Sequence, residues 1–268
     1  MSLNPLVSVI IPCFNHGLYI DECLNSVYRQ SYNNIEVIII NDGSTDKFTV
    51  DKLESINDCS IKIINSENRG LSNARNLGIN KSNGKYILPL DADDYISVEY
   101  ISKAVSILEE DEKIILVYGK AEYFGEKIGL WDLKPFSFQE MLLYNQIYAS
   151  AIFRKSDYLD TGGYDTNLNK GWEDWDFWLS MLTLHSNVYF INEVCFYYRV
   201  KSDSMIVRMS KEDMINARAY IYRKHYQLYN LLFSDPIQLY HEKCYYQNKY
   251  NLYFTRRVVN YIKNIFLK

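Results

Sequence analysis

The chain has 268 residues, of which 48% are hydrophobic and 23% are charged, with a formal net charge of −4. This composition is typical of a globular protein with a large core, and it excludes disordered and collagen-like proteins. No apolar stretch reaches the roughly 18 residues of a membrane-spanning helix, and the N-terminus lacks a signal-peptide pattern, so we expect a cytoplasmic protein.

Up to residue 118 the sequence alternates short apolar runs with stretches of helical periodicity. The expected strands are 7–11, 35–40, 61–64, 86–90 and 114–118, and the expected helices start at Ile20 and span 49–56, 71–79 and 98–109. Near-continuous apolar strands between helices predict an α/β fold with a mainly parallel sheet wound with helices. In such sheets ligands bind outside the carboxyl ends of the strands, so the residues just after each strand are candidate site residues.

Three acids follow the expected strand 86–90, in the sequence Asp91-Ala92-Asp93-Asp94. Carboxylates two residues apart at a strand end can turn together and hold a divalent cation against a diphosphate. Crowded carboxylates repel one another unless a cation offsets their charge, and a helix cap needs only one of them. We therefore predict that Asp91 and Asp93 hold a metal, whereas Asp94 is expected to cap the next helix.

Two other strand ends also carry polar or aromatic residues. The first strand runs into Pro12, Phe14 and Asn15, and the second runs into the segment 41–46, which contains Asp42. Three such ends at one edge of a sheet predict a single crevice. Taken alone, the segment 41–46 also fits an ordinary turn, because Asp-Gly-Ser is strong turn chemistry.

From about residue 119 the alternation is lost and the sequence becomes rich in aromatic residues. Asp174 shares one expected helical face with Phe177, Trp178 and Met181. An acid at the rim of a dry pocket can have a raised pKa and serve as a base. For Glu173 the better interpretation is an acid that complements the helix dipole.

Between about Val7 and Ser204 these motifs resemble glycosyltransferase family 2, whose members have the GT-A fold. The matching elements are VIIPCFN (9–15), NDGSTD (41–46), NRGLSNARN (68–76), GKY (84–86), the DXD-containing DADD (91–94) and ED (173–174). Each motif alone is weak, but six in the right order and spacing are specific.

The resemblance implies a nucleoside diphosphate sugar donor and a role for each matching residue. The implied donor-binding residues are Pro12, Phe14, Asn15, Asp42, Arg75, Asp91, Ala92, Asp93 and Arg199. Among them, Phe14 would lie against the base, Asp42 would accept its hydrogen bond as with uracil, and Arg75 would face the pyrophosphate. An alternative for Arg75 is a place in an ordinary polar helix start.

The metal and the base follow from the same resemblance. Asp93, with Asp91 acting through sugar hydroxyls or water, would place Mn²⁺ or Mg²⁺ on the phosphates, and Asp174 would deprotonate the acceptor hydroxyl. Arg199 falls in what looks like the mobile lid of the family. The family often has a histidine near Lys201, and this chain does not, although Lys201 could pair with phosphate.

The predicted function is metal-dependent sugar transfer from a nucleoside diphosphate donor, most readily a UDP-sugar, to a glycan or lipid-linked acceptor in surface polysaccharide synthesis. A metal neutralises the leaving group and one base suffices, so direct displacement should invert the anomeric centre. A nucleotidyltransferase would normally show a Gly-rich basic loop near the first strand, which is absent here. A non-catalytic nucleotide- or sugar-binding module on a degenerate transferase fold is the alternative.

The C-terminal part differs in charge from the rest, and we expect a transferase domain over 1–207 and a helical extension over 208–268. The extension carries 11 Lys or Arg against 4 Asp or Glu. Its expected last helix has an apolar face formed by Val258, Tyr261, Ile262, Ile265 and Phe266. This layout fits peripheral contact with the inner face of a membrane, or packing on the body or in a homodimer, and no nucleic acid is expected.

The five cysteines are widely scattered and form no CxxC pair: Cys13, Cys23, Cys59, Cys195 and Cys244. Their odd number and spacing predict reduced thiols rather than a disulfide framework or a zinc site.

Overall fold

The structure, a computed structural model, describes residues 4–202, 204–232 and 236–266. Its strands are β1 (Val7–Cys13), β2 (Ile35–Asp42), β3 (Ile61–Ser66), β4 (Tyr86–Pro89), β5 (Tyr95–Ile96), β6 (Ile114–Gly125), β7 (Gly129–Trp131), β8 (Ile152–Arg154) and β9 (Asn187–Val200). Its helices are α1 (Ile20–Tyr28), α2 (Lys47–Glu54), α3 (Leu71–Asn80), α4 (Tyr100–Glu110), α5 (Phe138–Met141), α6 (Lys155–Leu159), α7 (Glu173–Met181), α8 (Met205–Arg208), α9 (Lys211–Lys224), α10 (Tyr226–Leu232) and α11 (Pro236–Phe266).

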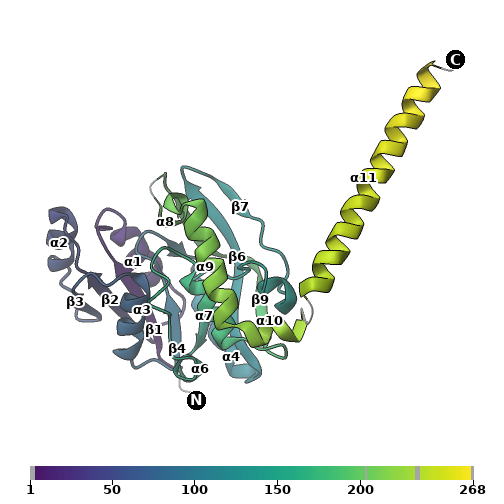
Figure 1. The fold of residues 1–268 in the computed structure, drawn as a ribbon. Helices are drawn as coiled ribbons and strands as arrows, with labels where there is room; N and C mark the ends of the chain where they lie inside the picture. The colour runs from purple at the N-terminus through teal and green to yellow at the C-terminus, as the bar shows by residue number, and fades with distance from the viewer. Residues whose placement is uncertain (1–3, 203, 233–235, 267–268) are drawn as a thin grey trace. The chain divides into compact units, whose positions relative to one another are not determined.

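The described strands form a 9-stranded sheet in the order β3-β2-β1-β4-β8-β6-β9-β5, with β7 paired to β6 (Figure 1). The first four strands are parallel, and β1 lies between β2 and β4. Every residue of β1 is buried, as expected for a strand whose two faces are covered. The predicted α/β fold with a mainly parallel sheet is confirmed, and its parallel half brings the ends of β1, β2 and β4 to one edge.

The second half of the sheet lies mostly beyond residue 119, in the part of the sequence that no longer alternates apolar runs with helical periodicity, and its strands were not predicted there. Strand β6 continues to Gly125 and pairs in parallel with β9, while β8 runs antiparallel between β4 and β6. Within β9 the buried residues are Ile191, Cys195 and Phe196. In the sequence of β9 the apolar residues form two runs, 188–191 and 194–198, which Asn192 and Glu193 divide, rather than one continuous run like those of the first strands.

The helix starts depart from the expected positions in two places. Helix α2 begins two residues early, because the side chain of Asp46 accepts a hydrogen bond from the Thr49 amide at 2.8 Å and caps it. The expectation that Asp94 caps α4 was wrong, since Glu99 occupies the N-cap position. Asp94 is only 3% exposed and instead accepts a hydrogen bond from the backbone N–H of Arg199 at 2.8 Å.

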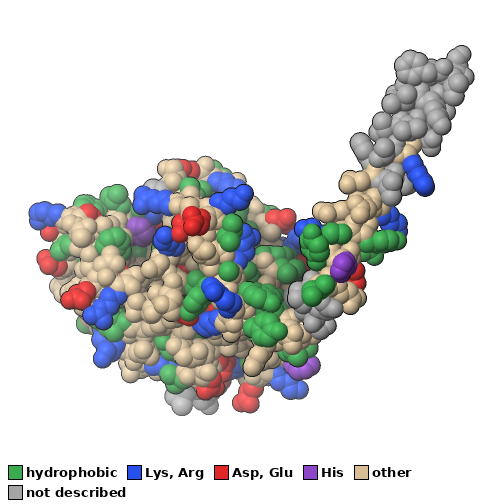
Figure 2. All heavy atoms as spheres, viewed as in Figure 1, with side chains coloured by type: hydrophobic (Ala, Val, Ile, Leu, Met, Phe, Trp, Pro, Cys, Tyr) green, Lys and Arg blue, Asp and Glu red, His purple; other side chains and the backbone are tan. Residues whose placement is uncertain are grey.

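The chain divides into two compact units, with the boundary between Ile221 and Tyr222. The expected domain boundary at residue 207 stays a prediction. On the face of the first unit drawn in Figure 2, basic and acidic side chains are interspersed. In the second unit, α11 is helical as expected, but the apolar face predicted from Val258 to Phe266 falls on side chains outside those described.

Two further observations concern membranes and thiols. No helix within the described residues has both the length and the apolarity needed to cross a bilayer. All five cysteines are free, and Cys13, Cys23 and Cys195 are buried. Burial raises the pKa of the Cys13 thiol to about 11, which keeps it in the unreactive protonated form.

Helix α3 packs on β1 and β2, and Gly78 lies at this contact. A methyl group on Gly78 would lie 2.3 Å from Cγ2 of the fully buried Ile10. We expect Gly78→Ala to lower the free energy of unfolding by about 1–3 kcal/mol through overpacking, although alanine favours a helix.

Urea denaturation measures this change, and Asn80→Ala at the exposed end of the same helix is the matched control, expected to stay within about 0.5 kcal/mol of wild type. If both variants are equally stable, α3 does not depend on close contact at Gly78.

Candidate active site

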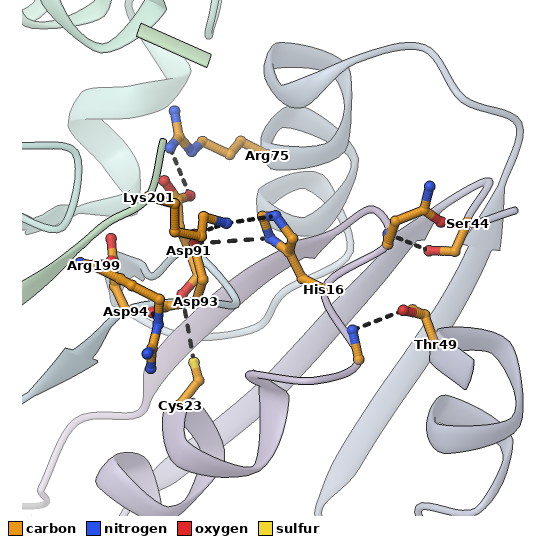
Figure 3. Close-up of polar contacts among 12 residues, drawn as sticks. His16, Cys23, Ser44, Thr49, Arg75, Asp91, Asp93, Asp94, Arg199 and Lys201 are labelled. Carbon is orange, nitrogen blue, oxygen red and sulfur yellow. Dashed lines mark hydrogen bonds and ion pairs between the residues drawn. The ribbon is translucent and has the colours of Figure 1, made fainter. Parts of the chain in front are cut away.

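The acid cluster lies at the carboxyl end of β4, where Asp91, Asp93 and Asp94 come close together (Figure 3). Ala92 between them is fully buried, and the carbonyl of Asp91 accepts hydrogen bonds from the Asp94 amide and the Cys23 thiol. Burial, followed by the charges of Asp93 and Asp91, raises the pKa of Asp94 well above its ordinary value. The cluster therefore needs positive charge around it to remain ionised.

Two residues near the end of β9 supply part of that charge. The ammonium of Lys201 lies 2.6 Å from Oδ2 of Asp93. Arg199 donates from Nε to the carbonyl of Asp93 at 2.9 Å and forms an ion pair with Glu22. Arg199 lies in β9 and pairs with β6, and Lys201 lies just beyond the strand. The mobile lid expected at this place stays a prediction.

Arg75 of α3 supplies further positive charge to the cluster. Its side chain is 1% exposed and donates to Oδ1 of Asp91 at 2.8 Å and to Oε1 of Glu173 at 2.6 Å. Burial alone would lower the pKa of Arg75, but the charges of Asp91 and Glu173 raise it above its ordinary value. The residue expected to face the pyrophosphate thus joins the acid cluster to the first residue of α7.

The carboxylate of Asp174 lies one residue further along α7. Its Oδ1 accepts a hydrogen bond from the Trp175 amide at 2.8 Å, and its Oδ2 accepts one from Nδ2 of Asn145 at 2.9 Å. Burial, followed by the charge of Glu173, raises the pKa of Asp174 to about 7, against the opposing effect of Arg75. A carboxylate with this pKa is suited to accept a proton near neutral pH.

The backbone is strained at Trp172, the residue just before Glu173 and Asp174 at the start of α7. Trp172, with φ of 63°, is in the left-handed region that a bulky residue rarely adopts. The helix itself is buried on more than the single face that the sequence predicted, since Trp175, Asp176 and Leu179 are buried as well as Phe177. Its position is therefore determined by packing all around it.

The ends of β1 and β2 form a second group of polar contacts, at the expected nucleotide side. Asn15, also in the left-handed region, accepts hydrogen bonds at Oδ1 from the amides of Thr45 and Asp46 and so ties the two strand ends together. Asp42 is 4% exposed, and its two oxygens accept the amides of residues 69 and 70, each at 2.9 Å. This carboxylate thereby holds the start of α3.

The remaining expected donor residues flank this group. Pro12 is a buried member of β1, and Phe14 just after the strand is 41% exposed. The structure thus brings Arg75, Asp91, Asp93 and Arg199 into one network next to Asp174. Asn15 and Asp42 belong to the neighbouring group of contacts.

Two polar residues of this region were not among the predicted site residues. His16 lies with Nδ1 3.8 Å from Oδ1 of Asp93 and with Nε2 3.1 Å from the Lys201 ammonium. A histidine just after a strand end was a usable signal for this residue. Asn145, which holds Asp174, lies in a segment without periodicity, and the sequence contained no signal for it.

The acid cluster offers carboxylate ligands for a hard divalent cation, but not a complete set of them. Carboxylate oxygens are the ligands that Mg²⁺ prefers, and the mutual repulsion at Asp94 is of the kind a cation relieves. Asp91 and Asp93 each have one oxygen next to a cation, Arg75 at Asp91 and Lys201 at Asp93, so each keeps its other oxygen for a metal. Within the described residues, no three His, Cys, Asp or Glu side chains form a group that could hold a metal, so phosphate or water would have to complete the site.

We expect Arg75→Met to lower the free energy of unfolding by about 3–5 kcal/mol, because Asp91 and buried Glu173 would lose their shared partner. Urea denaturation measures the loss. Arg69→Met removes the same charge from an exposed pair with Glu67 and should cost less than about 1 kcal/mol. Equal losses in the two variants would contradict a structural role for the buried pairs.

Comparison with known proteins places this site in a family. The family model described as Glycosyl transferase family 2 matches residues 8–167. An uncharacterized glycosyltransferase of Haemophilus influenzae is 40% identical over 156 residues, which cover 56% of this chain and 48% of that protein. Glycosyltransferase GlyA of Streptococcus pneumoniae is 37% identical over 132 residues, which cover 49% of this chain and 19% of that protein. The match thus spans about half or less of these relatives.

Solved structures share the fold at low sequence identity. S. aureus TarS 1-349 in complex with UDP-GlcNAc matches with a TM-score of 0.66 and 20% identity, covering 85% of this chain and 72% of that chain. Mannosyltransferase PcManGT from Pyrobaculum calidifontis, in complex with GDP-Man and Mn²⁺, matches with a TM-score of 0.58 and 20% identity, covering 82% and 71%. The expected GT-A fold is confirmed, and because the family model covers more than half of the residues, the chain belongs to glycosyl transferase family 2.

Proposed function

We propose that this chain is an inverting, metal-dependent glycosyltransferase that moves a sugar from a nucleoside diphosphate to an acceptor hydroxyl. One observation carries the proposal. Buried Arg75 binds Asp91 of the acid cluster and Glu173, the residue before Asp174, at 2.8 and 2.6 Å. A single side chain therefore holds the donor side and the base in a defined relation, as group transfer between two bound substrates requires.

On the donor side, Asp93 with Asp91 would hold Mn²⁺ or Mg²⁺, and the metal when bound neutralises the charge of the leaving diphosphate. Exposed Phe14 offers a ring for the nucleotide base. A UDP-sugar is the donor we propose, because Asp42 can accept the N–H of uracil through a second lone pair on either oxygen. TarS and PcManGT were solved with UDP-GlcNAc and with GDP-Man and Mn²⁺, which supports a nucleotide-sugar donor.

On the acceptor side, Asp174 would take the proton of the attacking hydroxyl. Its carboxylate is oriented by Asn145 and by the Trp175 amide, so one lone pair of each oxygen is engaged and another remains for the substrate. With one base and no second carboxylate acting as nucleophile, displacement occurs in one step and inverts the anomeric centre. A glycan or lipid-linked acceptor in surface polysaccharide synthesis is part of this proposal, and the basic C-terminal helices are its expected membrane or dimer contact.

The first test is calorimetric titration of the chain with UDP, GDP, TDP and CMP, each with and without Mn²⁺. We expect one nucleoside diphosphate to bind more tightly with Mn²⁺ than without it. Asp93→Ala should lower the affinity measured with Mn²⁺ at least roughly tenfold. Asp51→Ala, at an exposed ion pair with Lys47, is the control for the loss of one negative charge. If no nucleotide binds, the degenerate binding-module alternative fails together with the transferase.

The second test is the catalytic role of Asp174, read as release of nucleoside diphosphate. We expect Asp174→Asn to slow release by roughly 10²–10⁴-fold while nucleotide affinity is kept. In the wild type the rate should fall as the pH drops below about 7, because Asp174 becomes protonated. A variant that keeps both the rate and the pH profile would rule out Asp174 as the base.

The raised pKa also has a consequence for stability. Between pH 3.8 and about 7 the folded chain keeps a proton on Asp174 that the unfolded chain has lost, so this carboxyl makes the fold less stable as the pH rises. We expect the stability of Asp174→Asn relative to wild type to increase by roughly 4 kcal/mol across this range, measured by denaturation at several pH values. A constant difference would mean that Asp174 titrates normally.

A further inference from the structure

The ammonium of Lys201 occupies a defined position between Asp93 and His16 (Figure 3). Its Nζ lies 2.6 Å from Oδ2 of Asp93 and 3.1 Å from Nε2 of His16. The side chains of Lys201 and Asp93 are each 14% exposed, so solvent screens this contact only in part. Lys201 is thus the cation that this carboxylate holds.

The two partners of Lys201 present lone pairs to one point. A lysine ammonium can only donate, so Nε2 of His16 must be the acceptor, and the ring proton is then on Nδ1, on the side of Asp93 Oδ1. A carboxylate oxygen and an imidazole nitrogen that converge on one cation are donors that a transition metal also accepts. The ammonium and a divalent metal would therefore compete for the same two atoms.

Lys201 can leave this position without disrupting the strand before it. Arg199 is anchored by bonds to Asp94 and Asp93, and Val200 ends β9, whereas Lys201 lies in the connection to α8. Besides Asp93 and His16, its ammonium also lies 4.8 Å from the ring centre of Tyr19. Exchange at Asp93 therefore requires movement of one long side chain.

We propose that Asp93 and His16 form a cation site that Lys201 fills, and that a divalent metal binds there by displacing the Lys201 ammonium. The inference rests on the proposed use of a metal at Asp93 and adds two residues to it. His16 is a metal ligand supplied by the end of the first strand, and Lys201 is an internal competitor that lowers metal affinity. Binding of the metal releases the Lys201 side chain from Asp93 and His16.

The test is a titration of the full chain with Mn²⁺ alone, in which electron paramagnetic resonance counts the free ion. We expect Lys201→Met to bind Mn²⁺ roughly tenfold more tightly than wild type, within the range typical of coupled binding. Lys201→Arg keeps the positive charge and should retain the weaker wild-type affinity. Lys47→Met removes the same charge at an exposed ion pair with Asp51 and controls for net charge.

His16→Ala is the second variant, and it should weaken Mn²⁺ binding at least roughly tenfold, because a ligand is lost. Unchanged affinity in Lys201→Met, or a gain no larger than in Lys47→Met, overturns the competition. Unchanged affinity in His16→Ala overturns its role as a ligand. Absence of Mn²⁺ binding in every variant overturns the whole exchange, and sugar transfer is judged separately, because the effect of Asp174→Asn on diphosphate release does not depend on this titration.

Discussion

Repulsion among three carboxylates at the end of one buried strand is the constraint on which the rest of this site depends. Asp91, Asp93 and Asp94 can be ionised together only if positive charge and N–H donors surround them. The chain offsets this repulsion in part from separate elements, with Arg75 on α3 and with Lys201 and the backbone of Arg199 at the end of β9, while the pKa of Asp94 stays raised by burial and by its neighbouring acids. The acid cluster thereby links β4, in the parallel half of the sheet, to the end of β9 in the other half.

Arg75 extends the same electrostatic network to the base. A buried guanidinium is stable only with its partners in place, and both of its carboxylates are contributed by other elements. The opposing charges of Glu173 and Arg75, together with burial, set the pKa of Asp174 near neutrality. Charge balance on the donor side and proton affinity on the acceptor side are thus parts of one arrangement.

The first half of the fold could be predicted because strands covered on both faces have near-continuous apolar sequences. The expected ends of the strands near Val7, Ile35 and Ile61 lie within two residues of the observed ones. Strand β9 was missed because Asn192 and Glu193, at an irregularity in its pairing with β6, divide its apolar residues into two short runs. Asp94 was mistaken for a helix cap because strand β5 intervenes before α4, which no local pattern indicated.

The sequence by itself determined which strand ends carry the acids, and the order of its motifs was enough to indicate the family and the GT-A fold. It also singled out Asp174, because acid followed by bulky apolar residues is a local pattern. Only the tertiary structure decided the partners, since Arg75, His16 and Lys201 reach the acids from positions 16 to 108 residues away in the chain. Such pairings depend on strand order and on how helices pack, and these are properties of the folded sheet rather than of any local segment.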